Sequence, residues 1–302
     1  MKKTICCIGS SGFIGREIYN NLKNFKTFEI FRYSSQKNEF LDPCNLKTFD
    51  YLIFSAGIHN ESENDTKNIF YETKKIFKNT KNIFFNSNSI IYISSFKTCF
   101  NLNEKIIKSS NQYNYYDFDN NYGKSKIIFE KLFIRFCKNF NKKYKIVCPS
   151  HVIGPNDTGH SANGKFFNNL LKKKIIFFPD CNISLVDVRN LSQVISNILI
   201  NEDFDNSKVI VNDTSITIKD YIEQIKLNEK NYIKIKINLF YLKILFLLNQ
   251  ILIKIKLTKK DFISKNRIKY IEINPITELT NQKRKISFNQ TILDTRNFFL
   301  KK

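Results

Sequence analysis

Short apolar runs and longer amphipathic stretches alternate along the first half of the chain. The apolar runs have the length of strands, and they cover residues 4–8, 27–31, 51–54, 89–93 and 144–148. Between them, apolar residues recur at the three- and four-residue spacing of helices, as in Ile127, Ile128, Leu132, Phe133 and Phe136. This alternation predicts an α/β fold with a doubly wound, mainly parallel sheet.

The stretch 66–84 repeats the pattern Thr-Lys-x-Ile-Phe three times with a period of seven residues. That period stacks the Ile-Phe pairs on one face of a helix and the lysines on another. Three copies are too few for a long coiled coil, so we expect a helix that packs on the sheet. Part of the same face is a candidate contact with a second subunit in a homodimer.

The stretch from Leu239 to Leu257 is strongly apolar. Its longest charge-free run, 244–253, would span roughly 15 Å as a helix, against a hydrocarbon core of about 30 Å, so we expect no transmembrane span. With Lys243, Gln250 and Lys254 as one polar stripe, the pattern favours a mostly buried helix. The alternative is weak contact with a membrane surface, helped by nearby lysines.

Composition adds a large positive charge without a nucleic-acid motif. Of the 302 residues, 42% are apolar, which is enough for a large core, and the formal net charge is +22. The basic residues are nearly all lysine and are spread along the whole chain, and the longest run is only Lys172–Lys174. We therefore expect no nucleic-acid partner.

The seven cysteines include the pair Cys6-Cys7 but no Cys-x-x-Cys and no zinc-like spacing, so we predict no metal site. They are interpreted as reduced thiols of a cytoplasmic protein. The N-terminus enters the first strand directly, without the apolar segment and cleavage site of a signal peptide.

A glycine-rich turn follows the first strand immediately. Its sequence is Gly9-Ser10-Ser11-Gly12-Phe13-Ile14-Gly15, and an amphipathic stretch comes next. A strand, a glycine turn and a helix together let backbone amides and the helix N-terminus approach a pyrophosphate. We therefore expect a dinucleotide here, with contacts from Gly9, Ser11, Gly12, Phe13, Ile14 and Gly15.

Three further positions bear on the dinucleotide. Arg32 ends the second strand, where a cation suits the 2′-phosphate of NADP and an acid suits the ribose of NAD, so NADP is preferred and NAD stays open. Residues 40–42 resemble a short strand that ends in Asp42. Ala56 and Gly57 follow the strand 51–54, and such small residues leave room for a ligand.

Tyr122 and Lys126 are the candidate reactive pair. Residues four apart share a helix face, so the ammonium can stand beside the phenol. A tyrosine titrates near ~10, and a cation about 4 Å away at an effective dielectric near 20 offsets roughly the 4 kcal/mol needed to bring it to neutral pH. Ser95 follows the strand 89–93, where a hydroxyl would point into the ligand crevice.

These motifs, in this order, resemble the extended short-chain dehydrogenase/reductases. The shared features are the glycine turn, Ser95, Tyr122-x-x-x-Lys126, and the stretches 149–155 and 184–191. Within that group the chain is similar to the NAD-dependent epimerase/dehydratase family, which acts on nucleotide sugars. The resemblance covers roughly residues 3–225 and implies a Rossmann domain at 1–165, to which 184–212 returns, and a smaller C-terminal substrate-binding lobe at 166–302.

The resemblance also implies roles for single residues. Ser95 would hydrogen-bond the reacting substrate oxygen, Tyr122 would transfer the hydroxyl proton, and Lys126 would hold the nicotinamide ribose. Asp42 matches a carboxylate that contacts the adenine, and Pro149 lies at the cofactor. His151 stands where many members place an asparagine that faces the nucleotide sugar.

Departures from the family pattern narrow the reaction. Ser95 is followed by Phe96-Lys97, whereas sugar dehydratases carry an Asp-Glu pair there, which disfavours dehydration. A 4-ketosugar reductase and a nucleotide-sugar epimerase remain, and Arg32 and the back half of the chain favour the reductase. A dinucleotide-sensing or scaffold protein without turnover is the alternative of another class, although the intact set Ser95, Tyr122 and Lys126 argues against it.

Overall fold

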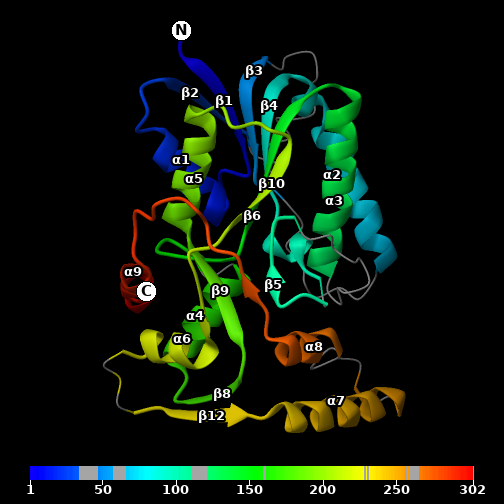
Figure 1. Ribbon diagram of the computed structural model, residues 1–302, viewed down its shortest axis with the longest axis vertical. Helices are drawn as coiled ribbons and strands as arrows, with labels where there is room; N and C mark the ends of the chain where they lie inside the picture. Colours follow the sequence, from blue (N-terminus) through cyan, green and yellow to red (C-terminus); the bar gives the residue numbers. More distant parts are fainter. Residues whose placement is uncertain are drawn as a thin grey trace.

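A six-stranded parallel sheet forms the centre of the computed structural model, which describes residues 1–33, 47–56, 66–101, 103–110, 121–158, 161–227, 229, 231–255, 257–258 and 265–301. Its strand order is β10-β6-β4-β3-β1-β2 (Figure 1). The strands are β1 (Lys3–Ile8), β2 (Phe28–Tyr33), β3 (Phe49–Phe54), β4 (Ser87–Ile93), β6 (Lys143–Pro149) and β10 (Ser207–Val211). This confirms the α/β, doubly wound parallel fold. The strand expected at 40–42 lies outside the described residues.

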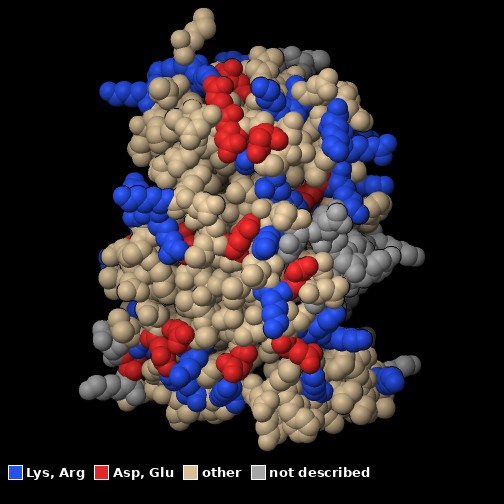
Figure 2. Space-filling model, viewed as in Figure 1, with Lys and Arg blue, Asp and Glu red and all other residues tan. Residues whose placement is uncertain are grey.

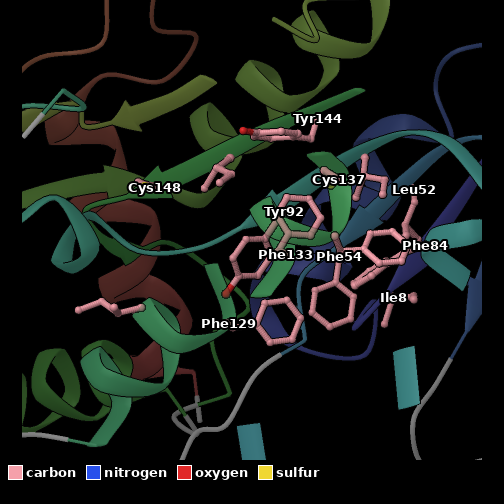
Figure 3. Close-up of a cluster of buried hydrophobic side chains, with 14 of the residues drawn as sticks. Ile8, Leu52, Phe54, Phe84, Tyr92, Phe129, Phe133, Cys137, Tyr144 and Cys148 are labelled. Atoms are coloured by element: carbon pink, nitrogen blue, oxygen red, sulfur yellow. The ribbon is translucent and has the colours of Figure 1, made fainter. Parts of the chain in front are cut away.

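Helices cover both faces of the sheet because successive strand residues point to opposite sides. Cys6 and Ile8 pack toward α2 (Thr66–Phe85) and α3 (Asn121–Asn139), whereas Ile5 and Cys7 pack toward α1 (Phe13–Leu22) and α5 (Val188–Ile200). The predicted helix at 66–84 is thus confirmed. On the α2/α3 side the core is aromatic: Figure 3 shows Tyr92 of β4 among the rings of Phe54, Phe84, Phe129 and Phe133.

The strand order reverses at β1, which pairs with β2 on one side and with β3 on the other. In open α/β sheets, ligands bind outside the carboxyl ends of the strands at such a switch point. Ile8, Phe54 and Ile93 are the last residues of β1, β3 and β4, so the segments after these strands are the first candidates for a site.

The second lobe is built from small sheets and short helices. One sheet has the order β11 (Thr214–Thr217), β9 (Asn182–Asp187), β7 (His151–Ile153), and two strand pairs join β8 (Ile175–Pro179) to β12 (Ile233–Ile237) and β5 (Ile106–Ile107) to β13 (Ile276–Thr277). Its helices are α4 (Ala162–Lys172), α6 (Ile218–Ile225), α7 (Leu239–Lys254), α8 (Lys265–Ile273) and α9 (Phe288–Leu300). The 3-10 turn η3 (Phe96–Cys99) instead follows β4 and packs against β6 and α3.

Two expectations for this half need correction. The strand 184–186, which is part of β9, does not enter the main sheet. The chain leaves that sheet after β6, and the next strand, β7, pairs with β9. Of the returning stretch 184–212, β10 is the strand that pairs with β6, and α5 packs against α1.

The helix at 239–257 was expected to be mostly buried, but in α7 only Leu242 and Asn249 are buried. The lobe covers one stripe of this helix, and a helix that is apolar nearly all round carries no pattern that reveals how much of it is covered. Within the part of the chain that the structure describes, no helix is long and apolar enough to cross a membrane.

Candidate active site

The glycine turn between β1 and α1 forms a tight cradle. Gly9 has a φ of +82°, and the amide of Gly12 donates to the carbonyl oxygen of Gly9 at 3.0 Å. A Cβ at Gly15 would lie 2.2 Å from that same oxygen, so only glycine lets α1 approach β1 so closely. Gly12 begins α1 without a side-chain cap, which leaves the first amides, next to Phe13 and Ile14, for a ligand. Ser11 is exposed in the turn.

Arg32 lies beside this turn at the end of β2. Its Nε donates to Ser10 Oγ at 3.1 Å, and its guanidinium lies 4.5 Å from the ring centroid of Tyr19. Arg32 is exposed, as a residue that binds a phosphate from solvent must be. Asp42, which was expected to contact the adenine, and Gly57, which was expected to line the cofactor, lie outside the described residues.

Tyr122 and Lys126 lie in the first turns of α3, as their spacing predicts. Lys126 is 7% exposed, and its Nζ lies 5.8 Å from the ring centroid of Tyr122 and donates to the carbonyl oxygen of Ile93 at 3.1 Å. Burial lowers the pKa of Lys126 to about 8, while the nearby Glu130 opposes that change. The ammonium therefore stays charged at neutral pH but can lose its proton in mild alkali.

Ser95 is buried directly after β4, where its Oγ accepts from the amide of Lys97 at 3.3 Å and caps η3. Through this turn the Lys97 ammonium lies 5.2 Å from the ring centroid of Tyr122. The segment after β4 and the start of α3 thus meet around one phenol, which has two ammonium groups beside its ring. Sequence reasoning found Lys97 only as a departure from the dehydratase pattern.

His151 and Pro149 lie near the carboxyl end of β6. The imidazole Nδ1 is 3.0 Å from the carbonyl oxygen of Ser184, and the ring centroid lies 5.0 Å from that of Phe96. Burial and the charge of Lys97 lower the pKa of His151 to about 4, so the ring is neutral at pH 7. A neutral imidazole on this wall suits hydrogen bonding rather than charge pairing.

Glu130, which sequence reasoning missed, holds together the segments that form the site. Its carboxylate is 1% exposed and accepts from Ser94 Oγ at 2.5 Å, Thr98 Oγ1 at 2.6 Å and Lys208 Nζ at 2.6 Å. These bonds connect α3 to the segment that follows β4 and to β10. The signal for it was the same four-residue spacing, since Glu130 lies one turn beyond Lys126.

A nicotinamide dinucleotide fits the residues present. Besides the glycine cradle, a small cavity of about 10 Å³, which has room for about one water molecule, is lined by Ala56, Thr73, Tyr92 and Lys126, among others. Thr73 Oγ1 in this cavity and Ser150 Oγ after Pro149 are buried and hydrogen-bond to no residue within the described ranges. Buried hydroxyls without partners are unfavourable unless a ligand or water completes them.

The comparisons with known proteins agree with this geometry. Residues 5–182 match the model of the NAD dependent epimerase/dehydratase family. The chain belongs to this family. Its members are enzymes that use a nicotinamide dinucleotide, which confirms the resemblance drawn from the motifs. A search of curated protein sequences found no match.

Solved structures with the same fold include a UDP-N-acetylglucosamine 4-epimerase from Methanobrevibacter ruminantium M1, with UDP-N-acetylmuramic acid bound, at 17% identity and a TM-score of 0.68, covering 100% of this chain and 99% of that one. RMD from Pseudomonas aeruginosa, complexed with NADPH, has 14% identity and a TM-score of 0.67, covering 98% and 99%. A GDP-6-OMe-4-keto-L-xylo-heptose reductase from C. jejuni has 11% identity and a TM-score of 0.70, covering 99% and 98%. At these identities the likeness establishes the fold.

Proposed function

We propose that the chain is an NADPH-dependent reductase of a 4-keto nucleotide sugar. The observation that carries this proposal is the phenol of Tyr122 with the ammonium groups of Lys126 and Lys97 at 5.8 and 5.2 Å from its ring centroid. Ser95 caps the turn that carries Lys97. Two cations beside one phenol favour its anionic form and hence the release of its proton.

In the proposed reaction, bound NADPH supplies a hydride for the ketone carbon. Ser95 donates a hydrogen bond to the ketone oxygen and polarises it, and Tyr122 transfers its proton to that oxygen as negative charge develops there. Lys126 stabilises the resulting phenolate until a proton from solvent restores the phenol. His151, neutral at pH 7, is the proposed hydrogen-bonding contact of the sugar nucleotide.

The preference for NADP rests on Arg32 beside the glycine turn. Its hydrogen bond to Ser10 holds the guanidinium near the place where a 2′-phosphate at the end of β2 would lie. NAD remains the alternative. The remaining proposed cofactor contacts are the backbone of the glycine turn, Ala56 and Pro149.

The neighbours include both reaction types that the sequence left open. Against dehydration, the two residues after Ser95 contribute an aromatic ring on His151 and an ammonium at Tyr122 instead of two carboxylates. An epimerase is the second candidate, because it needs the same three groups but keeps its NAD bound through a closed cycle.

The deciding experiment incubates the purified protein with 4-keto sugar nucleotides and NADPH and follows NADPH by absorbance. We expect substrate-dependent NADPH consumption. The epimerase would instead leave NADPH unconsumed and carry NAD through purification. Denaturing the pure protein and identifying the released dinucleotide provides the second readout.

Two further features belong to this proposal. Phe70, which belongs to the repeated Ile-Phe pairs of α2, is 45% exposed, which supports the proposed homodimer contact on this helix face. All cysteines among the described residues are buried free thiols, as a reducing cytoplasmic location predicts.

A further inference from the structure

The helix α7 presents most of its apolar side chains to the outside. Their exposed fractions range from 37% to 64%. They are Phe240, Tyr241, Ile244, Leu245, Leu247, Leu248, Ile251 and Leu252. Soluble proteins seldom expose so many large apolar side chains on one element, and such patches mark interaction sites.

These side chains share one side of the helix. At 3.6 residues per turn they fall on a continuous arc of about 160°. The buried Leu242 and Asn249 lie on the other side and hold α7 against the lobe. Lys243, Gln250 and Lys254 lie together along one margin of the apolar arc. The helix is therefore apolar on both sides: the inner side is held against the lobe, and the outer apolar side points away from the core.

The two-stranded sheet next to α7 extends this apolar surface. Ile175 pairs with Ile233 and Phe177 pairs with Ile235, so the four side chains share the outer face, where they are 39–62% exposed. β12 runs directly into α7 along the same end of the molecule (Figure 1). In Figure 2 this end carries a broad area of tan atoms around α7, with both basic and acidic side chains along its border.

Lysines border this surface. Lys172, Lys173 and Lys174 are exposed immediately before β8, and Lys254 is exposed at the end of α7. None of these four makes an ion pair with a carboxylate among the residues that the structure describes. Lys236 and Lys243 do pair, with the exposed Asp180 and Glu272.

We propose that the outer faces of α7 and of the β8/β12 pair, together called the apolar end, dock on an anionic lipid surface. α7 would lie in the plane of the interface with its apolar arc among the upper acyl chains and its bordering ammonium groups at the phosphates. At 16 residues it is about 24 Å long, which suits lying on a bilayer rather than crossing it.

Charge decides between a lipid surface and a second copy of the chain. A twofold contact through the apolar end would bring Lys172–Lys174 and Lys254 of two copies, each with a formal net charge of +22, toward one another. Anionic headgroups complement the same lysines, each of which contributes about fivefold to partitioning.

A tryptophan reporter gives the first test, because the chain contains no tryptophan. Leu248→Trp places the reporter within the apolar arc at a position 51% exposed, and Leu293→Trp places it on α9 at one 47% exposed. We expect vesicles of phosphatidylcholine with phosphatidylglycerol to shift the Leu248→Trp emission to shorter wavelength and to leave the Leu293→Trp emission unchanged. No shift at position 248, or the same shift at both positions, would overturn the proposal.

Flotation with the same vesicles gives the second test. Leu248→Gln should lower the partition coefficient for the vesicles about tenfold. The matched Leu293→Gln should bind like the wild type. Replacing Lys172, Lys173 and Lys174 by Gln should weaken binding by about a hundredfold, and high salt should act similarly. Lipid docking would be refuted if the wild-type protein stayed in the vesicle-free fraction. If, in addition, analytical ultracentrifugation showed a wild-type dimer and a Leu248→Gln monomer, the apolar end would be assigned to a second copy.

Discussion

Replacing Lys126 by Met should make the protein more stable and inactive at the same time. Burial lowers the pKa of Lys126 from 10.5 to about 8, which corresponds to a cost of about 3 kcal/mol for keeping the charge in the folded protein at pH 7. Methionine removes that cost but also the bond to the carbonyl oxygen of Ile93, worth about 1 kcal/mol. The net expectation is a gain of about 2 kcal/mol.

The gain should depend on pH in a defined direction. Below pH 8 Lys126 is protonated in both the folded and the unfolded chain, so the full cost of burial is present. Between about pH 8 and 10.5 the folded protein loses this proton first, so the cost falls and wild-type stability rises relative to Lys126→Met. The advantage of the variant should therefore be largest at pH 7 and shrink steadily above pH 8.

Urea unfolding of both proteins at pH 7 and pH 9.5 measures this difference, with Lys138→Met as the control. Lys138 is exposed on the same helix, so its replacement should change the free energy of unfolding by less than about 1 kcal/mol at either pH. Turnover by Lys126→Met should fall at least about a hundredfold. A variant less stable than the wild type at pH 7, or an advantage independent of pH, would refute the reasoning.

Three other predictions concern the cofactor side and the anchor of the site. Gly15→Ala should destabilise the fold by about 1–3 kcal/mol in urea unfolding, because the new Cβ would lie 2.2 Å from the carbonyl oxygen of Gly9. In Gly12→Ala the new Cβ would lie 3.4 Å from the same oxygen, so this variant should fold normally but bind dinucleotide more weakly by calorimetry. Arg32→Ala should raise the KM for NADPH about tenfold or more and leave the KM for NADH nearly unchanged. Equal effects on both KM values would contradict a contact between Arg32 and the 2′-phosphate. Glu130→Gln should lower the free energy of unfolding by about 3 kcal/mol because it leaves the largely buried ammonium of Lys208 without its anion. Glu272→Gln, at an exposed pair, should lower it by less than about 1 kcal/mol.

The main sheet could be predicted from the sequence because strand-length apolar runs and helical periodicity are local signals. The predicted strand at 89–93 and the helix at 66–84 match β4 and α2 closely. Which sheet a strand joins depends instead on the edges that are available, and the sequence of 184–186 does not contain that information. The exposure of α7 was missed for a related reason, since apolar residues all round a helix predict burial unless the surface available to cover them is known.

The candidate site followed the same division. The spacing of Tyr122 and Lys126 fixes their shared helix face, so their proximity could be predicted. Lys97 comes close to Tyr122 only because η3 turns the chain after Ser95, and no periodicity encodes that turn. Glu130 contacts groups from three other segments, so its spacing from Lys126 could suggest the residue but not its role.

The measurement that tests the central proposal most directly follows one hydrogen atom. The protein is incubated with a 4-keto sugar nucleotide and with NADPH that carries two deuterium atoms at C4 of the nicotinamide, and the mass of the sugar product is measured by mass spectrometry. We expect one deuterium on the reduced carbon with the wild type and no labelled product with Tyr122→Phe, which should still bind NADPH. A product without deuterium, or equal labelling by Tyr122→Phe, would contradict a reductase in which Tyr122 supplies the proton.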